Sequence, residues 1–474
     1  MHDTLPPGPT AHPALQLFRW VQSPLAVLDE NARRFGDAFT LRMLGVPPMV
    51  ILREAAAIRD VFNGDPEVLY AGEGHFVVEP LVGSKSLLIL DGARHVAERR
   101  LLLPPFHGER MRAYGVVMRD VTDTAIDRWA PGVPIVAHDE MQRITMEVIL
   151  HTVFGLSDEA RLSWWRPRLA ELLSCATSTS VLMAAYALRA PRMKRWMTRV
   201  PNLRLGSRMR DPAARFSLVR LYRLLAETDA MMAREIAARR EAGAEAGGDD
   251  ILSLLVAARD EAGNGLDDAE LRDEMMTLLL TGYETSSTTL ALALHFVLSS
   301  PPVLARVRDE LRAVSGGGPL RPDDVARLEI LDAVLKETLR LVPIVPVVTR
   351  RLRAPMVVAG MHLPAGTIVA PCPYLAQRRP GTWDAPEEFR PERFLGRRTA
   401  HEYLPFGGGA RRCIGMAFAN YEMKVVLAEV FSRADLRLAA TGPLRVVRRH
   451  VTMAPAGGVP LVVDGVRPRV LAAA

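Results

Sequence analysis

One cysteine of this 474-residue chain is surrounded by residues that could give it a chemical role. It lies in "FGGGARRCIGMAFA", residues 406–419, where three glycines and two arginines come just before Cys413. The run from Gly415 has helical periodicity, so the sulfur would lie near a helix N-terminus. Free N–H groups there, together with Arg411 and Arg412, would stabilise a thiolate.

The residues alone leave several roles open for Cys413. A lone cysteine is often a buried structural residue, but the glycines and arginines favour a thiolate that acts as a nucleophile or a metal ligand. A phosphatase-type nucleophile would need an arginine six residues later, where this chain has Ala419. A hydrolase nucleophile would need a histidine base, which this segment does not identify. Covalent c-type haem is excluded, because no Cys-x-x-Cys-His occurs.

The same segment resembles the haem-ligand signature of the cytochrome P450 family, Phe-x-x-Gly-x-Arg-x-Cys-x-Gly. The resemblance implies that Cys413 is the axial thiolate ligand of a haem b iron, which would favour O–O cleavage. It also implies a monooxygenase that inserts one atom of dioxygen into its substrate. The residues of this segment that would bind the cofactor are Phe406, Gly407, Arg411, Cys413 and Gly415.

A helix expected at 267–299 carries "TGYETSSTTL" between apolar flanks. Its mid-helix glycine costs about 1 kcal/mol relative to alanine, and its hydroxyls can bond preceding carbonyls and loosen the helix. The stretch resembles the family's oxygen-binding groove. That resemblance implies that Thr285 hydrogen-bonds dioxygen and that Glu284 helps to deliver protons. Thr281 stands where the family usually has Ala or Gly, which would either narrow the groove or add a hydroxyl to it.

Two further patterns match the family. In "DGARHVAERR", His95 and Arg99 lie four residues apart on a predicted helix, where the family binds haem propionates, and Arg350 and Arg411 match the other propionate partners. In "KETLR" and "FRPERF", the matching positions imply a structural network of Glu337, Arg340 and Arg393.

Smaller features complete the resemblance, which spans residues 35–465. "DDILSLL", residues 249–255, is weakly similar to the family, and Gln377 stands where a histidine is frequent. The positions implied to line an apolar substrate pocket are Phe76, Val77, Val78, Leu81, Val82, Thr281, Pro346, Val347, Val348 and Val451. "LLLPPFHGERM" favours a fatty acyl or terpenoid substrate, although apolar residues at these positions could equally belong to the core.

The pattern of hydrophobic residues predicts a mainly helical fold with a smaller β-rich part. Period-3.6 stretches are expected at 53–64, 93–103, 106–129, 137–154, 158–178, 212–242, 249–260, 267–299, 302–315, 328–341 and 415–433. A hairpin is expected at 37–52, and short strands after residue 343. We expect residues 1–474 to form a single cytochrome P450 domain, with a Pro-rich lead at 1–20 and a short helix before residue 37.

Composition limits the cellular setting. The N-terminus lacks the pattern of a signal peptide, and no run approaches the roughly 20 apolar residues of a membrane span. Three cysteines, Cys175, Cys372 and Cys413, favour a reducing environment without structural disulfides. We therefore expect a cytoplasmic monomer without a transmembrane anchor.

The net charge of +6 is mild for this length, and no nucleic-acid-binding motif occurs, so we expect no nucleic acid partner. No dinucleotide fingerprint or flavin domain is present, which implies a separate ferredoxin or flavodoxin with its reductase. We expect this acidic carrier to dock near Arg100, Arg110, Arg112, Arg412 and Lys424. The basic segment 189–210 is interpreted as a solvated loop or a mobile flap.

Other functions compete with the monooxygenase. A Cys-dependent hydrolase or transferase would be colourless, and a haem-binding sensor or carrier would not need Glu284 and Thr285. Peroxide-driven chemistry on the same fold is a further alternative, but it typically lacks this acid–hydroxyl pair.

Overall fold

The computed structural model describes residues 5–75, 77–176, 181, 218–243, 248–396 and 402–469. Two sequence predictions lie outside this part of the chain: Phe76 as a pocket residue, and the basic segment 189–210.

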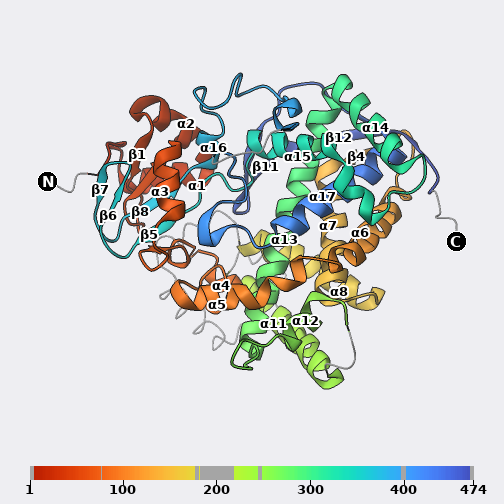
Figure 1. Ribbon diagram of the computed structural model, residues 1–474, viewed down its shortest axis with the longest axis horizontal. Coiled ribbons are helices and arrows are strands. Elements are labelled where there is room, and N and C mark those ends of the chain that lie inside the picture. The colour runs from red at the N-terminus through yellow and green to blue at the C-terminus, as the bar shows by residue number, and fades with distance from the viewer. Residues whose placement is uncertain are drawn as a thin grey trace.

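A large helical part and a smaller β-rich part lie side by side (Figure 1). In the described chain the α-helices are α1 Pro13–Gln22, α2 Pro24–Phe35, α3 Ala55–Asn63, α4 Glu79–Val82, α5 Gly92–Leu102, α6 Arg110–Ile126, α7 Ala137–Phe154, α8 Glu159–Ala176, α11 Leu218–Ala242, α12 Ile251–Ala257, α13 Asp268–Leu298, α14 Pro301–Ser315, α15 Glu329–Leu341, α16 Pro373–Ala376 and α17 Met416–Arg433.

The strands come from both ends of the chain. They are β1 Ala38–Leu41, β2 Met49–Leu52, β3 Leu69–Tyr70, β4 Pro134–Val136, β5 Arg350–Leu352, β6 Met356–Val358, β7 Met361–Leu363, β8 Ile368–Pro371, β9 Ala434–Leu438, β10 Val446–Arg449, β11 Thr452–Pro455 and β12 Pro460–Val466. They form one five-stranded sheet, β1-β2-β8-β5-β3, one three-stranded sheet, β4-β12-β9, and the pairs β6-β7 and β10-β11.

The pairing in the largest sheet joins distant parts of the sequence. β1 and β2 form the expected antiparallel hairpin, and β2 pairs in parallel with β8, with Met49 opposite Ile368. The Pro-rich lead also contacts this sheet, because Thr40 donates its backbone N–H and its hydroxyl to the carbonyls of Pro7 and Pro6.

Helix α13 runs through the middle of the molecule and organises its core (Figure 1). It begins with a capping box, in which the Asp267 side chain accepts the Glu270 N–H and the Glu270 side chain accepts the Asp267 N–H. Most of its residues are buried against neighbouring helices, including α7 and α17. Gly282 lies against α7, since a Cβ there would come within 2.7 Å of Ile149 Cδ1.

The predicted fold class is confirmed, and most predicted helices match to within a few residues. The prediction was wrong in the first 37 residues, where two helices replace one because the chain turns at Ser23–Pro24. Three short strands were also missed: β3, β4 and β9. Of the predicted helix 212–242, only residues from 218 onward lie in the described chain.

Within the described residues, no single helix has the length and apolar composition to cross a membrane. Only α13 and α14 taken together meet that criterion, and the two are bent by 111° relative to each other.

Candidate active site

Cys413 lies in a tight loop that leads into helix α17. The loop is closed by the backbone N–H of Cys413, which donates to the carbonyl of Phe406 at 3.0 Å. A short 3₁₀ turn, Gly409–Arg411, precedes the cysteine, and α17 begins at Met416 after Gly415. The cysteine therefore lies just before the helix N-terminus, as expected from the sequence.

Two glycines of this loop are required by close contact with α3. A Cβ at Gly409, where φ is +64°, would lie 2.1 Å from the carbonyl oxygen of Phe62, and one at Gly408 would lie 2.4 Å from the Phe62 ring. These glycines therefore allow the loop to lie directly against Phe62 of α3. By contrast, a Cβ at Gly415 would have no neighbour within 4 Å.

The sulfur of Cys413 faces open space although it lies deep in the protein. Its side chain is exposed, yet desolvation by the surrounding protein raises the pKa of its thiol. The Gly415 N–H and the charges of Arg99 and Arg412 act in the opposite direction and favour the thiolate. A cation bound at the sulfur would favour the thiolate over the thiol, because metal coordination deprotonates a thiol.

A group of basic side chains gathers beside this loop. His95, Arg350 and Arg411 line one cavity together with Gly408. Burial, followed by the charges of Arg411, Arg99 and Arg350, lowers the pKa of His95 to about 3. Burial and Arg411 lower the pKa of Arg350 to about 10. The positive charge of each arginine disfavours the charged form of its basic neighbours. An anionic ligand bound among these side chains would reduce that repulsion.

Two residues of this group were missed by the sequence analysis. Asp91 is an ion-pair partner of Arg411, and it accepts the backbone N–H groups of Ala71 and Gly72 at 2.8 and 3.0 Å. His75 donates its Nδ1–H to the Ala71 carbonyl at 2.8 Å, and burial together with Arg350 lowers its pKa to about 4. Asp91 pairs with Arg411 and His75 lies near Arg350, and no local pattern reveals partners so distant in sequence.

These residues fit a haem with its two propionates. Cys413 offers a thiolate to iron, Arg99, Arg350 and Arg411 offer cationic donors to carboxylates, and His95 offers a ring nitrogen. Bound haem iron with a thiolate ligand supplies the chemistry of dioxygen activation.

One side of α13 borders open space in the middle of an otherwise buried helix. Leu278, Thr281 and Thr285, spaced at three and four residues, are less buried than most of their neighbours. The Thr285 hydroxyl donates to the Thr281 carbonyl at 2.8 Å, and the Thr281 hydroxyl donates to that of Thr277 at 2.7 Å. These hydroxyl oxygens keep their lone pairs free to accept a hydrogen bond from a molecule beside the helix.

Glu284, the predicted proton donor, is buried next to these residues, and its carboxylate is held by other side chains. Its two oxygens contact Gln142 of α7 and His450 of the β10–β11 turn. Burial alone would raise the pKa of Glu284, but the hydrogen bond and charge of His450 outweigh it, so the pKa lies below its ordinary value.

The predicted pocket residues differ in how deeply their side chains are buried. Leu81, Val82 and Pro346 are buried, and the first two belong to the main hydrophobic core. Val348 lies beside the cysteine loop, with its Cγ1 4.0 Å from where a Cβ at Gly407 would be. Val451 is 49% exposed in the turn that reaches α13. The remaining described positions, Val77, Val78 and Val347, are half-buried.

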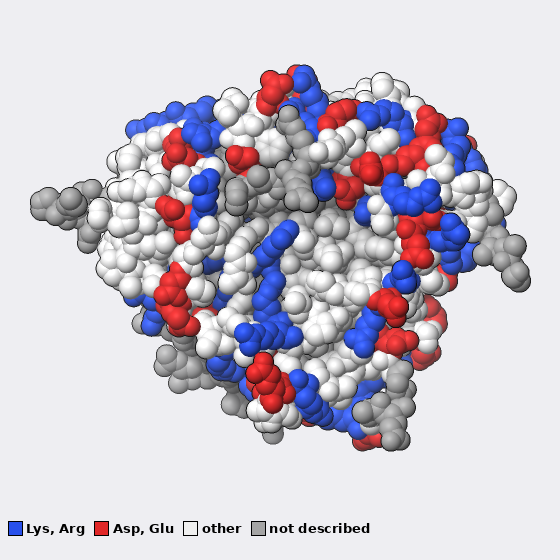
Figure 2. Space-filling view, in the orientation of Figure 1, with Lys and Arg blue, Asp and Glu red and all other residues white. Residues whose placement is uncertain are grey.

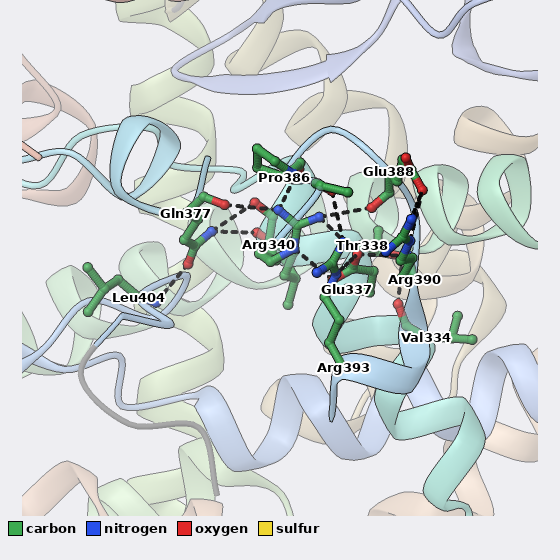
Figure 3. A network of polar contacts seen from close by, with 12 residues as sticks. Val334, Glu337, Thr338, Arg340, Gln377, Pro386, Glu388, Arg390, Arg393 and Leu404 are labelled. Carbon is green, nitrogen blue, oxygen red and sulfur yellow. Dashed lines mark hydrogen bonds and ion pairs between the residues drawn. The ribbon is translucent and has the colours of Figure 1, made fainter. Parts of the chain in front are cut away.

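The network of Glu337, Arg340 and Arg393 is assembled in the core beside α15 (Figure 3). Arg340 makes a bidentate ion pair with Glu337, with distances of 2.7 and 2.8 Å, and Arg393 Nε lies 3.2 Å from Glu337 Oε1. Arg340 also donates to three carbonyls, those of Gln377, Pro386 and Glu388. Glu337 and Arg340 are fully buried, so every charge of this pair is compensated by hydrogen bonds.

Gln377 extends this network to the cysteine loop (Figure 3). Its side-chain amide donates to the carbonyls of Leu339 and Arg340 at the end of α15, at 3.1 and 3.0 Å. Its side-chain oxygen accepts the backbone N–H of Leu404 at 2.7 Å, two residues before Phe406. The glutamine therefore satisfies carbonyls that a helix end leaves free and ties them to the segment that carries Cys413.

Known proteins share both the sequence and the fold. A sequence model of the cytochrome P450 family matches residues 6–459. A Mycobacterium tuberculosis protein named as cytochrome P450 135B1 is 37% identical over 98% of this chain and 92% of its own length. Another, named 135A1, is 32% identical over 96% and 94% of the two chains.

Two solved structures match nearly the whole chain with a TM-score of 0.81. One is a cyanobacterial CYP120A1 with retinoic acid bound, at 22% identity, covering 98% of this chain and 100% of that one. The other is the haem domain of cytochrome P450DA, at 26% identity, covering 98% of each. The chain belongs to the cytochrome P450 family, and it is a haem-thiolate monooxygenase. The alternatives of a Cys-dependent hydrolase and a non-catalytic carrier are thereby set aside.

Proposed function

We propose that this monooxygenase oxidises a hydrophobic small molecule of the fatty acyl or terpenoid kind, with haem b bound through Cys413. The observation that carries the proposal is that Cys413 is exposed beside the basic group and that Thr281, in the middle of the mostly buried helix α13, is exposed as well. Apolar side chains that are not fully buried, such as the half-buried Val348 and the exposed Val451, suit an apolar substrate.

The chain's own residues take distinct roles in this proposal. Arg99, Arg350, Arg411 and His95 hold the propionates. Thr285 positions dioxygen, and Glu284 supplies protons. Because both Thr285 and Glu284 are present, we favour turnover driven by dioxygen over turnover driven by peroxide. Free cysteines at positions 175, 372 and 413 support a reducing, cytoplasmic setting.

The family needs electrons from a redox partner, and we propose an acidic ferredoxin or flavodoxin. Arg100 is 75% exposed, and Arg110, Arg112 and Arg412 are also exposed. Figure 2 shows positively charged side chains in a row across the middle of one face, with acidic side chains mostly nearer its edges. Lys424 contributes less than expected, because it is only 15% exposed and lies 3.7 Å from Asp332.

Charge reversal tests this docking surface. Arg100→Glu combined with Arg412→Glu should slow reduction by the carrier and weaken its salt dependence, because steering depends on complementary charge. Arg437→Glu, an exposed arginine in β9 paired with Asp464, serves as the control. Unchanged reduction rates and salt slopes in the double variant would exclude this surface.

A ligand screen on the purified protein tests the substrate class. Fatty acids and terpenoids that displace water from the iron should shift the Soret band, whereas polar compounds of similar size should not. Thiolate ligation is tested separately, because Cys413→Ser should lose the characteristic difference spectrum of the reduced, carbonyl-bound form. A variant that kept that spectrum would show that another residue ligates the iron.

A further inference from the structure

Both oxygens of Glu284 are engaged by residues of other elements. Gln142 donates its Nε2 to Oε2 at 2.8 Å, and Nδ1 of His450 lies 3.0 Å from Oε1. The Glu284 side chain is 4% exposed, and that of His450 is 16% exposed. His450 is therefore the more solvent-accessible member of this pair.

The backbone of His450 is held in an uncommon conformation that directs its ring toward α13. Its φ is +55°, in the left-handed region that few residues other than glycine adopt. Neighbouring hydrogen bonds fix the turn: Arg448 Nη1 donates to the His450 carbonyl at 2.5 Å, and the Thr452 hydroxyl donates to the Arg449 carbonyl at 3.0 Å.

The other charged and titratable groups near Glu284 come from α7, α13 and β10. His138 of α7 lies between Arg449, at 2.6 Å, and Thr288 of α13, at 3.0 Å. Burial and Arg449 lower the pKa of His138 to about 4, so this imidazole is neutral at pH 7. Arg449 also donates to the Oε1 of Gln142 at 3.2 Å. Tyr283 of α13 interacts with the charge of Glu284, and Asp139 of α7 acts on His138.

We propose that His450 is a positioning residue for Glu284 and the residue through which this carboxyl group exchanges protons with solvent. The inference rests on the proposed function, in which Glu284 delivers protons toward Thr285. Each proton that leaves Glu284 is replaced by one that moves from Nδ1 of His450 to Oε1, and the imidazole regains a proton from solvent.

Two substitutions in the full-length holoenzyme separate the parts of this role. His450→Asn keeps a hydrogen-bond donor but removes the imidazole ring, whereas His450→Gly removes both, and each residue suits a φ of +55°. His295→Asn is the matched control. It removes a histidine from α13, the helix that carries Glu284, but at a position eleven residues or roughly 16 Å along the axis from Glu284.

The first readout does not depend on turnover. Infrared titration follows protonation of the Glu284 carboxyl group, whose band is identified by its loss in Glu284→Gln. We expect Glu284 to take up its proton at higher pH in both His450 variants, because burial then acts without the opposing charge. The titration should be unchanged in His295→Asn.

The second readout is the share of electrons recovered in product rather than in hydrogen peroxide. Because general acid catalysis typically contributes 10²–10⁴-fold, we expect product formation to fall about tenfold or more in His450→Asn. A larger solvent isotope effect should accompany that fall.

The outcomes distinguish this inference from the proposed function. If Glu284→Gln impairs product formation but the His450 variants leave both the infrared titration and the product yield unchanged, the role of His450 is refuted and that of Glu284 stands. If Glu284→Gln itself has no effect on product formation, the proposed proton delivery is wrong. Thermal unfolding and the carbonyl spectrum check that each variant is folded, and His450→Gln replaces any variant that is not.

Discussion

At the scale of single residues, burial decides which charges need a ligand. Arg350 is 95% buried beside Arg411 and His95, whereas its neighbour Arg351 lies nearer the surface and pairs with Glu73 at 2.7 Å. Two adjacent arginines of one strand thus have different tasks. The buried one lacks a full complement of opposite charge, so it is the better candidate to bind a propionate.

This contrast predicts different effects on haem retention. Arg350→Gln should release haem roughly 10–100 times faster, because a hydrogen bond to a charged group contributes about 1.5–3 kcal/mol. Arg351→Gln should release it at nearly the normal rate. Haem transfer to an excess of apomyoglobin measures both rates, and equal rates in the two variants would contradict a propionate role for Arg350.

A second residue-scale prediction concerns Glu422 of α17. The side chain is fully buried, and neither oxygen meets the geometry of a hydrogen bond with a described residue. The Ser286 hydroxyl lowers the pKa of this carboxyl group, but by less than burial raises it. Burial raises its pKa to about 8. Between pH 4.5 and 8 the folded protein therefore holds a proton that the unfolded chain releases, so this group makes the protein less stable as pH rises.

Glu422→Gln should remove that loss. Its unfolding free energy should exceed that of the unmodified protein by a growing margin from pH 4.5 to pH 8, reaching a few kcal/mol. Glu261→Gln, at a carboxyl group that is 97% exposed, is the control. Urea unfolding at several pH values measures the difference, and a margin that does not change with pH would refute the assignment.

At the scale of elements, close packing between α3 and the cysteine loop sets the position of the sulfur. Gly409→Ala would force a Cβ to within 2.1 Å of the Phe62 carbonyl, whereas Gly396, with a similar φ of +67°, has no neighbour within 4 Å of such a Cβ. Both substitutions introduce the same backbone strain of about 1–2 kcal/mol. Only the first adds a clash with backbone.

We therefore expect Gly409→Ala to destabilise the protein by about 2 kcal/mol or more beyond Gly396→Ala, and to lower the haem content on purification. Chemical unfolding and the ratio of Soret to protein absorbance provide the measurements. Equal stability and haem content in the two variants would show that the loop can move away from α3.

The sequence predicted elements well where local signals define them. Helix α7 was predicted with both ends correct. Its C-terminal end has a clear local signal, because Gly155 takes the left-handed conformation and donates its N–H to the His151 carbonyl. Strands β3 and β4 have only two and three residues, too few for a periodic pattern. Asp91, Gln377 and His450 were missed as partners because their contacts lie tens to hundreds of residues away in sequence.

At the scale of the whole molecule, the two larger sheets are assembled from segments that lie far apart in the sequence. Residues 49–52 pair with 368–371, and β4 near residue 135 pairs with β12 near residue 461. These pairings support the proposal of a single interlocked domain, since neither the five-stranded nor the three-stranded sheet is made from one continuous segment of the chain.

A single domain predicts one unfolding transition. Ile51→Ala, at a fully buried position in β2, should cost about 2–5 kcal/mol and lower the midpoints of far-UV circular dichroism and Soret absorbance together. Val357→Ala, at a position that is 51% exposed, should change neither midpoint. Loss of dichroism in a separate earlier step would instead indicate two units that unfold independently.

The pairing of β4 with β12 also bears on synthesis. A ribosome must translate more than 320 residues after β4 before the partner strand at Pro460–Val466 emerges. Contacts of such long range form slowly. The sheet β4-β12-β9 thus stays incomplete until residues 460–466 have been made, so its closure follows the synthesis of every helix in the described chain.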